Sequence, residues 1–141
     1  MCGLSFYCSL QSHPLHELEN SLLAMNHRGP DDRGILSMEI ANYHLGLGHN
    51  RLSILDLSEA GKQPMDLGHG VILAYNGEVY NHPSLRTLLE EKGYTFKGHS
   101  DTEIISLLYT EFGKDSFSML KGMFALVLID KNKQKVLIQS R

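Results

Sequence analysis

Short apolar runs, separated by glycine, asparagine and other turn residues, recur along most of this chain and constrain its fold more than any other feature. Runs typical of strands lie at 3–10, 34–38, 43–48, 51–55, 71–75, 79–80, 94–96, 123–129 and 135–139. Apolar residues at helical spacing lie at 14–28, 84–92 and 100–112. Because few intervals between strands are long enough for a βαβ crossover, the pattern predicts an α+β fold with largely antiparallel sheet.

Asn76-Gly77 stands between two of the predicted strands, 71–75 and 79–80. An Asn-Gly pair flanked by apolar runs is the strongest short-range signal for a type I′ hairpin turn, because both residues tolerate positive φ. Gly46 and Gly48 lie within and at the end of another predicted strand, where glycine indicates a bulge or a close approach of another part of the molecule. These positions are therefore expected to bend the sheet or to let it pack tightly.

The composition is that of a soluble globular domain. With 141 residues, 42% of them hydrophobic and 21% charged, the chain can form one domain with its own core. The formal net charge is −3, and the 13 lysine and arginine residues are scattered, so nucleic acid is not an expected partner. The longest apolar run, 123–129, is too short to span a membrane, and no basic and apolar leader is visible. We expect a cytoplasmic protein that does not enter membranes.

Cysteine and histidine usage gives no sign of a metal site. The two cysteines, Cys2 and Cys8, fit neither a disulfide framework nor a CxxC pair, and Cys8 is expected in the core. Eight histidines are present without HxxxH or HExxH spacing. We expect His27 to shape a loop and the other histidines to be structural or exposed.

Cys2 is the residue whose position suggests catalysis. If Met1 is removed, Cys2 carries both a thiol and a free α-amine. An amine with an ordinary pKa of about 7.7 to 8.0 can accept the thiol proton near neutral pH, so the nucleophile would bring its own base. Taken alone, a cysteine near a terminus is more often an inert or buried residue.

Four segments carry the most specific motifs of the chain. They are Met1-Cys2-Gly3, HRGPDD at 27–32, NRLSILD at 50–56 together with YNGEVYN at 75–81, and SDTE at 100–103. In this order and spacing they resemble the N-terminal glutaminase domain of glutamine-hydrolysing asparagine synthetases, and HRGPDD separates this group from the glucosamine-phosphate synthase and phosphoribosyl amidotransferase branches. The resemblance implies an N-terminal-nucleophile (Ntn) hydrolase, an αββα sandwich of largely antiparallel sheets covered by helices.

The resemblance also implies a reaction: the thiol of Cys2 attacks the side-chain amide of glutamine, ammonia leaves, and water hydrolyses the thioester. Arg51 matches the residue that holds the substrate α-carboxylate, a task suited to a bidentate guanidinium, although most arginines are simply solvated. Asp101 matches the carboxylate that receives the α-ammonium. An acid at this position, behind Ser100 and its capping-box partner Glu103, also stabilises a helix N-terminus.

Asn76 and Gly77 match the oxyanion-hole donors of the family, one through its side-chain amide and the other through its backbone N–H. The match continues further beyond Gly77 than a hairpin turn requires, which favours this role over the turn. Glu78 matches a residue that contacts the substrate amine, although an exposed strand glutamate is the common case. Leu52 and Ile54 are expected to line the pocket or to belong to the core.

Residues 1–141 are expected to form a glutaminase domain without its C-terminal end and without the ATP-dependent synthetase domain of the family. In the full-length protein the ammonia would serve amidation of aspartate, as in asparagine biosynthesis, or of a related carboxylate. ATP and magnesium are expected only in the synthetase domain, with no cofactor and no metal in this one. The expected partners are glutamine as substrate and the synthetase domain in cis, and a homodimer is left open.

Two other interpretations compete with glutaminase activity. A catalytically silent Ntn module would bind glutamine or a protein partner without turnover; the presence of every motif residue argues against it, and the expected lack of the C-terminal end argues for it. An Ntn hydrolase that cleaves other amides is disfavoured by the pair of opposite charges expected for an amino-acid substrate. Methionine removal decides between active and inactive forms, because a retained Met1 would turn the basic amine of Cys2 into an amide.

Overall fold

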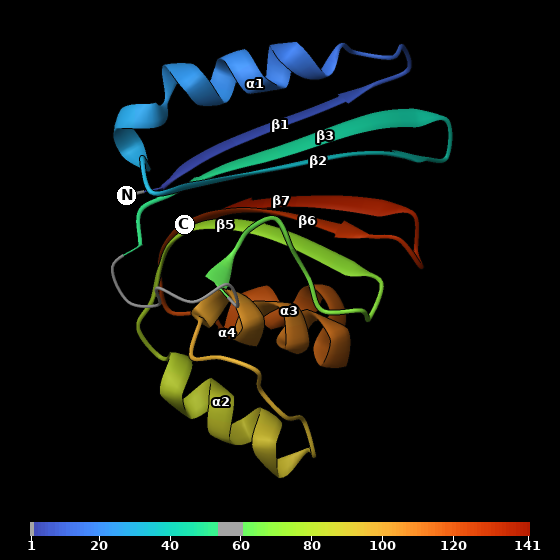
Figure 1. Cartoon of the computed structure of the whole chain (residues 1–141). Coiled ribbons are helices and arrows are strands. Elements are labelled where there is room, and N and C mark those ends of the chain that lie inside the picture. The colour runs from blue at the N-terminus through green and yellow to red at the C-terminus, as the bar shows by residue number, and fades with distance from the viewer. Residues whose placement is uncertain (1, 54–60) are drawn as a thin grey trace.

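The computed structural model describes residues 2–53 and 61–141, which form four stacked layers (Figure 1). One helix covers a three-stranded sheet, this sheet faces a four-stranded sheet, and further helices cover the far side of the second sheet. The arrangement confirms the predicted α+β fold class and its αββα layering.

All pairings of strands within the two sheets are antiparallel among the described residues, as predicted. The strands are β1 (Gly3–Ser9), β2 (Asp32–Ile40), β3 (Tyr43–Arg51), β4 (Met65–Asp66), β5 (Val71–Val79), β6 (Gly122–Asp130) and β7 (Lys135–Ser140). The helices are α1 (Leu15–Ala24), α2 (His82–Glu91), α3 (Asp101–Phe112) and α4 (Ser116–Met119), with short 3-10 helices η1 (Asn26–Arg28) and η3 (Gly113–Asp115). The first sheet has the order β1-β3-β2 and the second β4-β5-β6-β7.

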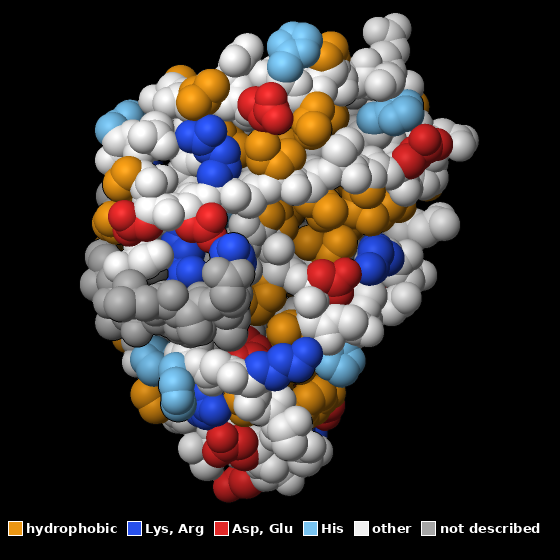
Figure 2. All heavy atoms as spheres, viewed as in Figure 1, with side chains coloured by type: hydrophobic (Ala, Val, Ile, Leu, Met, Phe, Trp, Pro, Cys, Tyr) orange, Lys and Arg blue, Asp and Glu red, His pale blue; other side chains and the backbone are white. Residues whose placement is uncertain are grey.

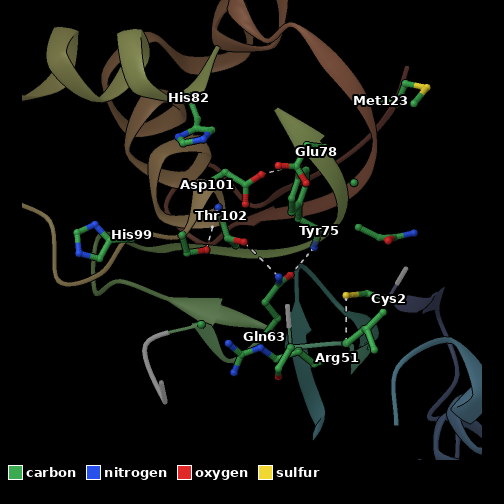
Figure 3. A pocket seen from close by; sticks show the side chains of 16 residues that line it. Cys2, Arg51, Gln63, Tyr75, Glu78, His82, His99, Asp101, Thr102 and Met123 are labelled. Carbon is green, nitrogen blue, oxygen red and sulfur yellow. Dashed lines mark hydrogen bonds between the residues drawn. The ribbon is translucent and has the colours of Figure 1, made fainter. Parts of the chain in front are cut away.

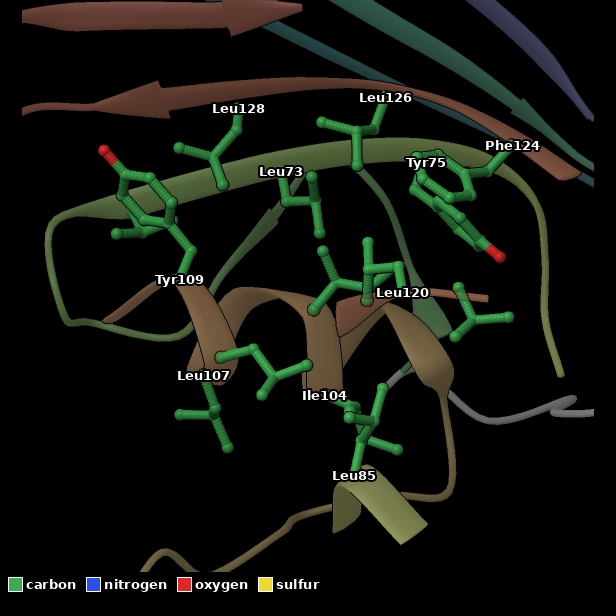
Figure 4. Close-up of a cluster of buried hydrophobic side chains, with 14 of the residues drawn as sticks. Leu73, Tyr75, Leu85, Ile104, Leu107, Tyr109, Leu120, Phe124, Leu126 and Leu128 are labelled. Carbon is green, nitrogen blue, oxygen red and sulfur yellow. The ribbon is translucent and has the colours of Figure 1, made fainter. Parts of the chain in front are cut away.

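The second sheet buries side chains on both faces, and its central strands β5 and β6 alternate between two clusters. Leu73 and Leu128 belong to the cluster that packs against α2 and α3 (Figure 4). Ile72 and Val127 belong to the cluster between the two sheets. Because neither face is exposed to water, these strands are nearly continuous apolar runs in the sequence.

The outer face of the first sheet is covered by α1, which contacts β3. A side chain at Gly48 would overlap Leu22 of this helix, and one at Gly46 would overlap the ring of Tyr7 on β1. The pairing of β3 with both neighbours is continuous in register. The two glycines therefore permit close packing, and the alternative of a bulge is wrong.

The hairpin turn that the Asn76-Gly77 pair by itself indicates does not form, because β5 runs through this pair without a break. Asn76 lies opposite Ala125 and Gly77 opposite Phe124 in one continuous ladder with β6. The signal for a turn is local, whereas the ladder depends on β6, which follows far along the chain. The pair is thus free to serve another purpose than chain reversal.

Other local predictions differ in smaller ways. The segment 94–96 forms no strand and packs Tyr94 and Phe96 onto the helical cluster from a loop. The strand predicted at 51–55 is wrong as far as the described residues show, since Arg51 is the last residue of β3 and residues 54–55 lie outside them. Cys8, expected in the core, is exposed on β1.

The start of α3 is fixed by two polar side chains. Ser100 caps the helix by accepting a hydrogen bond from the N–H of Thr102 at 3.1 Å. Glu103, expected to close a capping box, instead accepts from the N–H groups of Lys97 and Gly98 at 2.8 and 3.0 Å. The glutamate therefore holds the loop that leads into the helix.

Charged side chains of both signs are interspersed on the face shown in Figure 2, with hydrophobic side chains between them. Ion pairs join some of them, including Lys131 with Asp66 at 2.9 Å and Arg86 with Glu90 at 3.0 Å. No helix within 2–53 and 61–141 is long and apolar enough to cross a membrane.

We predict that Leu128→Ala lowers the free energy of unfolding by about 2–5 kcal/mol, because it removes a fully buried side chain, 0% exposed, from the cluster between β6 and α3. Leu10→Ala is the matched control: Leu10 is 68% exposed, and its truncation should change stability by less than about 0.5 kcal/mol. Urea denaturation measures both, and equal midpoints for the two variants would contradict the packing described here.

Candidate active site

A pocket of about 550 Å³ lies where the ends of β1, β3 and β5 meet the start of α3 (Figure 3). Its volume is within the range of small-molecule sites. Seven predicted site residues line it: Cys2, Arg51, Leu52, Asn76, Gly77, Glu78 and Asp101. The other predicted residue, Ile54, lies outside the described residues. The remaining lining residues are Ser53, Gly61, Gln63, Tyr75, His82, His99, Ser100, Thr102 and Met123.

Cys2 directly precedes β1, and the pairing of β1 with β3 carries it to the end of β3. Gly3 lies opposite Asn50, so Cys2 reaches the residues that follow on the partner strand. The N–H of Leu52 donates to the Cys2 sulfur at 3.4 Å, and the Arg28 Nε donates to the Cys2 carbonyl at 3.2 Å. These contacts fix both the backbone and the half-buried thiol at the pocket wall.

Arg51 ends β3 and is only 9% exposed. Its guanidinium lies so close to Gly61 that a side chain at that position would overlap it. Arg51 and Asp101 line the same pocket. A ligand in the pocket therefore meets a cationic side chain and the carboxylate of Asp101, with Glu78 as a second carboxylate. Groups of both signs are complementary to a zwitterionic amino acid.

Gly77 has a φ of +150°, a value that side chains rarely allow. A Cβ at this position would overlap the backbone of Met123 and Phe124 on the neighbouring strand β6. Glycine is required here because two strands approach closely beside the pocket. Asn76 and Glu78, on either side of Gly77, also line the pocket.

Asp101 is the first residue of α3 and is half-buried. Its Oδ2 accepts a hydrogen bond from the hydroxyl of Tyr75 at 2.7 Å. Burial raises the pKa of the Asp101 carboxyl above its ordinary value, while the Tyr75 hydroxyl, the Val79 N–H, the charge of His82 and the Thr102 N–H each lower it. The carboxylate thus depends on these neighbours to stay ionised in a partly dry site.

His49 is fully buried and connects the two sheets. Its Nε2 lies 3.1 Å from the carbonyl oxygen of Tyr75, which can only accept, so Nε2 carries the proton and donates. Nδ1 has no hydrogen-bond partner in the described part of the chain. Burial, assisted by the charge of Arg51, lowers the pKa of His49 to about 4, and the imidazole is neutral at physiological pH.

The side chain of Gln63 bridges the second sheet and α3. Its Oε1 accepts from the N–H of Tyr75 at 2.6 Å, and its Nε2 donates to the Thr102 hydroxyl at 3.1 Å. Tyr75 directly precedes Asn76, and Thr102 directly follows Asp101. Gln63 therefore sets the distance between two predicted site segments.

Several of these residues were not predicted as part of a site. Arg28 belongs to the HRGPDD motif and Tyr75 to the YNGEVYN motif, so their positions in the sequence could have identified them. No motif in the sequence marks Gln63, because the residues that it contacts come together only in the folded chain. His82 and His99, expected to be structural or exposed, line the pocket. Within 2–53 and 61–141 no group of three or more His, Cys, Asp or Glu side chains could hold a metal ion.

Comparison with known proteins gives a consistent picture. The family model of a glutamine amidotransferase domain matches residues 1–141. The chain is 39% identical to an amidase, chry2, of Gibberella zeae over 97% of this chain and 22% of that protein. It is 40% identical to the glutamine-hydrolysing asparagine synthetase 1 of Bacillus subtilis over 94% of this chain and 21% of that protein. The chain thus spans about a fifth of the length of the curated relatives it matches.

A solved structure shares the fold. The glutamine phosphoribosylpyrophosphate amidotransferase from B. subtilis, in complex with ADP and GMP, superposes with a TM-score of 0.75. The match covers 97% of this chain and 36% of that one, at 20% sequence identity. At this identity the likeness supports the αββα architecture alone.

We predict that acid weakens the fold through His49. The folded pKa of about 4 lies below the unfolded value of 6.5, so the unfolded state takes up the proton first and stability falls as the pH drops from 6.5 to 4. The loss should reach about 3 kcal/mol at most. His49→Gln keeps an N–H donor and does not titrate. The difference in the free energy of unfolding between wild type and this variant, measured by urea denaturation, should therefore shrink by this amount between pH 7 and pH 4. A constant difference would contradict the buried neutral histidine.

Proposed function

Because the chain belongs to the glutamine amidotransferase domain family, we propose that it hydrolyses the side-chain amide of glutamine to glutamate and ammonia through a thioester on Cys2. One observation carries the proposal: a thiol, a buried arginine, a carboxylate and the Asn76-Gly77 segment line one pocket of about 550 Å³. The arginine and the carboxylate suit the two charged groups of an amino acid, and the other groups suit acyl transfer at its side chain.

In the first half of the proposed reaction, removal of Met1 leaves Cys2 with a free α-amine, which accepts the thiol proton as sulfur attacks the amide carbon. Arg51 holds the substrate α-carboxylate and Asp101 its α-ammonium, so the amide is placed over the sulfur. The Asn76 side-chain amide and the Gly77 N–H stabilise the oxyanion. The C–N bond then breaks, and the protonated amine gives its proton to the leaving nitrogen, which departs as ammonia.

In the second half, water attacks the thioester carbon and gives a proton to the α-amine of Cys2. The same oxyanion donors stabilise the second tetrahedral intermediate. When the C–S bond breaks, sulfur recovers the proton and glutamate is released, so the site returns to its starting state. The reaction as proposed uses groups of this chain only and requires no cofactor.

Leu52 and Glu78 have supporting roles in the proposal. The N–H of Leu52 holds the sulfur at 3.4 Å, which orients the thiol before attack. Glu78 lines the pocket beside Gly77 and adds negative charge near the substrate α-ammonium. Ile54 stays a predicted pocket residue.

We further propose that the ammonia serves an ATP-dependent synthetase domain in a longer protein, which amidates aspartate or a related carboxylate. The asparagine synthetases among the relatives support this, as does the fraction of their length, about a fifth, that the chain spans. ATP and Mg²⁺ belong to that domain in the proposal, and a cytoplasmic location fits its substrates. Asparagine synthesis from ATP and aspartate by residues 1–141 alone would contradict this division of labour.

We predict that Cys2→Ala abolishes glutamate release from glutamine and leaves glutamine binding intact, because the anchoring charges of Arg51 and Asp101 remain. Coupled detection of glutamate measures turnover, and calorimetry measures binding. Cys8→Ala removes the other thiol, which is exposed on β1, and should retain wild-type turnover.

Turnover by the Cys2→Ala variant, or equal losses in both cysteine variants, would contradict a nucleophilic Cys2. Glutamine binding without turnover by wild-type chain that lacks Met1 would favour the silent binding module.

A further inference from the structure

Tyr75 lines the pocket and contacts three parts of the fold (Figure 3). Its N–H donates to Gln63 Oε1 at 2.6 Å, and its hydroxyl donates to Asp101 Oδ2 at 2.7 Å. Its carbonyl accepts from His49 Nε2 at 3.1 Å. The side chain is only 4% exposed. One residue is thus tied to the first sheet, to the segment before β4 and to α3.

The arrangement follows from the short length of β4. This strand pairs with β5 only at Leu73 and Ile72, and no further strand pairing covers Tyr75 on that side among the described residues. The backbone groups of Tyr75 are buried, so they need other partners. The side chains of Gln63 and His49 supply them, and the β5 segment that carries Asn76 and Gly77 is fixed as a result.

We propose that Tyr75 is a positioning residue for substrate binding: its hydroxyl orients the Asp101 carboxylate toward the substrate α-ammonium, at a set distance from the oxyanion donors that follow Tyr75 in β5. The inference rests on the proposed function and extends it to a residue that acts on the substrate through Asp101. One carboxylate oxygen is held by Tyr75, so the ammonium meets a carboxylate of fixed orientation.

The hydroxyl also keeps Asp101 in the form that binds a cation. Burial raises the pKa of the carboxyl, and the Tyr75 hydroxyl is the strongest of the neighbours that lower it again. The Tyr75 pKa is itself raised, by burial and by the charge of Asp101, so the hydroxyl stays a donor throughout the working range. The titratable and charged groups around this pair are Glu78 on β5, His82 on α2, His99 and Glu103 near the start of α3, and Cys2 and Arg51 across the pocket.

The competing explanation is that Tyr75 only fills the core. Its ring does pack in the cluster with Phe124, with ring centroids 6.5 Å apart. Tyr75→Phe keeps this ring and removes the hydroxyl alone, so it separates the two explanations. A pure packing role predicts no change in glutamine binding.

Tyr109 provides a matched control. Its hydroxyl donates to Asp130 Oδ2 at 2.9 Å, and its side chain is 3% exposed, so it forms the same kind of buried tyrosine–aspartate pair. Neither Tyr109 nor Asp130 lines the pocket. Tyr109→Phe therefore removes an equivalent hydrogen bond without touching the site.

The test compares kcat and KM for glutamine across pH in wild type, Tyr75→Phe and Tyr109→Phe. We expect Tyr75→Phe to raise KM about tenfold, since a hydrogen bond to a charged group is lost, and to leave kcat nearly unchanged. The acid limb of kcat/KM should move to higher pH, because Asp101 then protonates more easily. Tyr109→Phe should change neither KM nor this limb. An unchanged KM and pH profile in Tyr75→Phe, or equal effects in both variants, would overturn the proposal.

Two further measurements keep the proposal separate from glutaminase activity and from folding. Glutamine binding to Cys2→Ala, with and without Tyr75→Phe, reports on positioning even if wild type shows no turnover, and equal affinities would overturn the role of Tyr75. If Tyr75→Phe fails to fold, Asp101→Asn is measured in its place. The affinity of this variant for glutamine must no longer fall at acid pH, and an affinity that still falls as in wild type would overturn the proposal.

Discussion

The structure depends on the antiparallel register between β1 and β3. Gly3 lies opposite Asn50. Cys2, the residue before Gly3, therefore lies at the end of β3, which Arg51 closes and Leu52 follows. A shift of one residue would turn every side chain of β1 to the other face of the sheet and would separate the thiol from the pocket. The position of Cys2, which begins no element of its own, is therefore a property of sheet pairing.

The second sheet and α3 complete the site because both are fixed by the same buried contacts. β5 is covered on both faces along Val71–Tyr75, so the site residues that follow Tyr75 in this strand cannot shift without disturbing two clusters. Tyr75 ties this strand to His49 in one direction and to Asp101 in the other. Opposite charges are held at set positions in a partly dry pocket, where electrostatic interactions are stronger than in water.

The α+β class and the antiparallel sheets could be predicted from the sequence, because amphipathic helices and apolar strand runs are local patterns. The αββα layering is expected only from the resemblance of the motifs to a known family. The Asn76-Gly77 pair shows where this approach fails: its local signal is that of a turn, and only the close approach of β6 makes it a strand site. The strand expected at 94–96 fails for a similar reason, since its aromatic residues pack on helices from a loop. The motifs predicted seven of the sixteen residues that line the pocket. Gln63 and His49 acquire their roles only through contacts between distant segments.

The measurement that tests this account most directly is acid quenching of the chain during glutamine turnover, followed by mass mapping of its peptides. The account predicts a glutamyl group, which is glutamate less one water, on a peptide that begins with Cys2 and lacks Met1. A glutamyl group on any other residue, Cys8 included, or its absence from a preparation that steadily releases glutamate, would contradict the thioester at the end of the β1–β3 pairing.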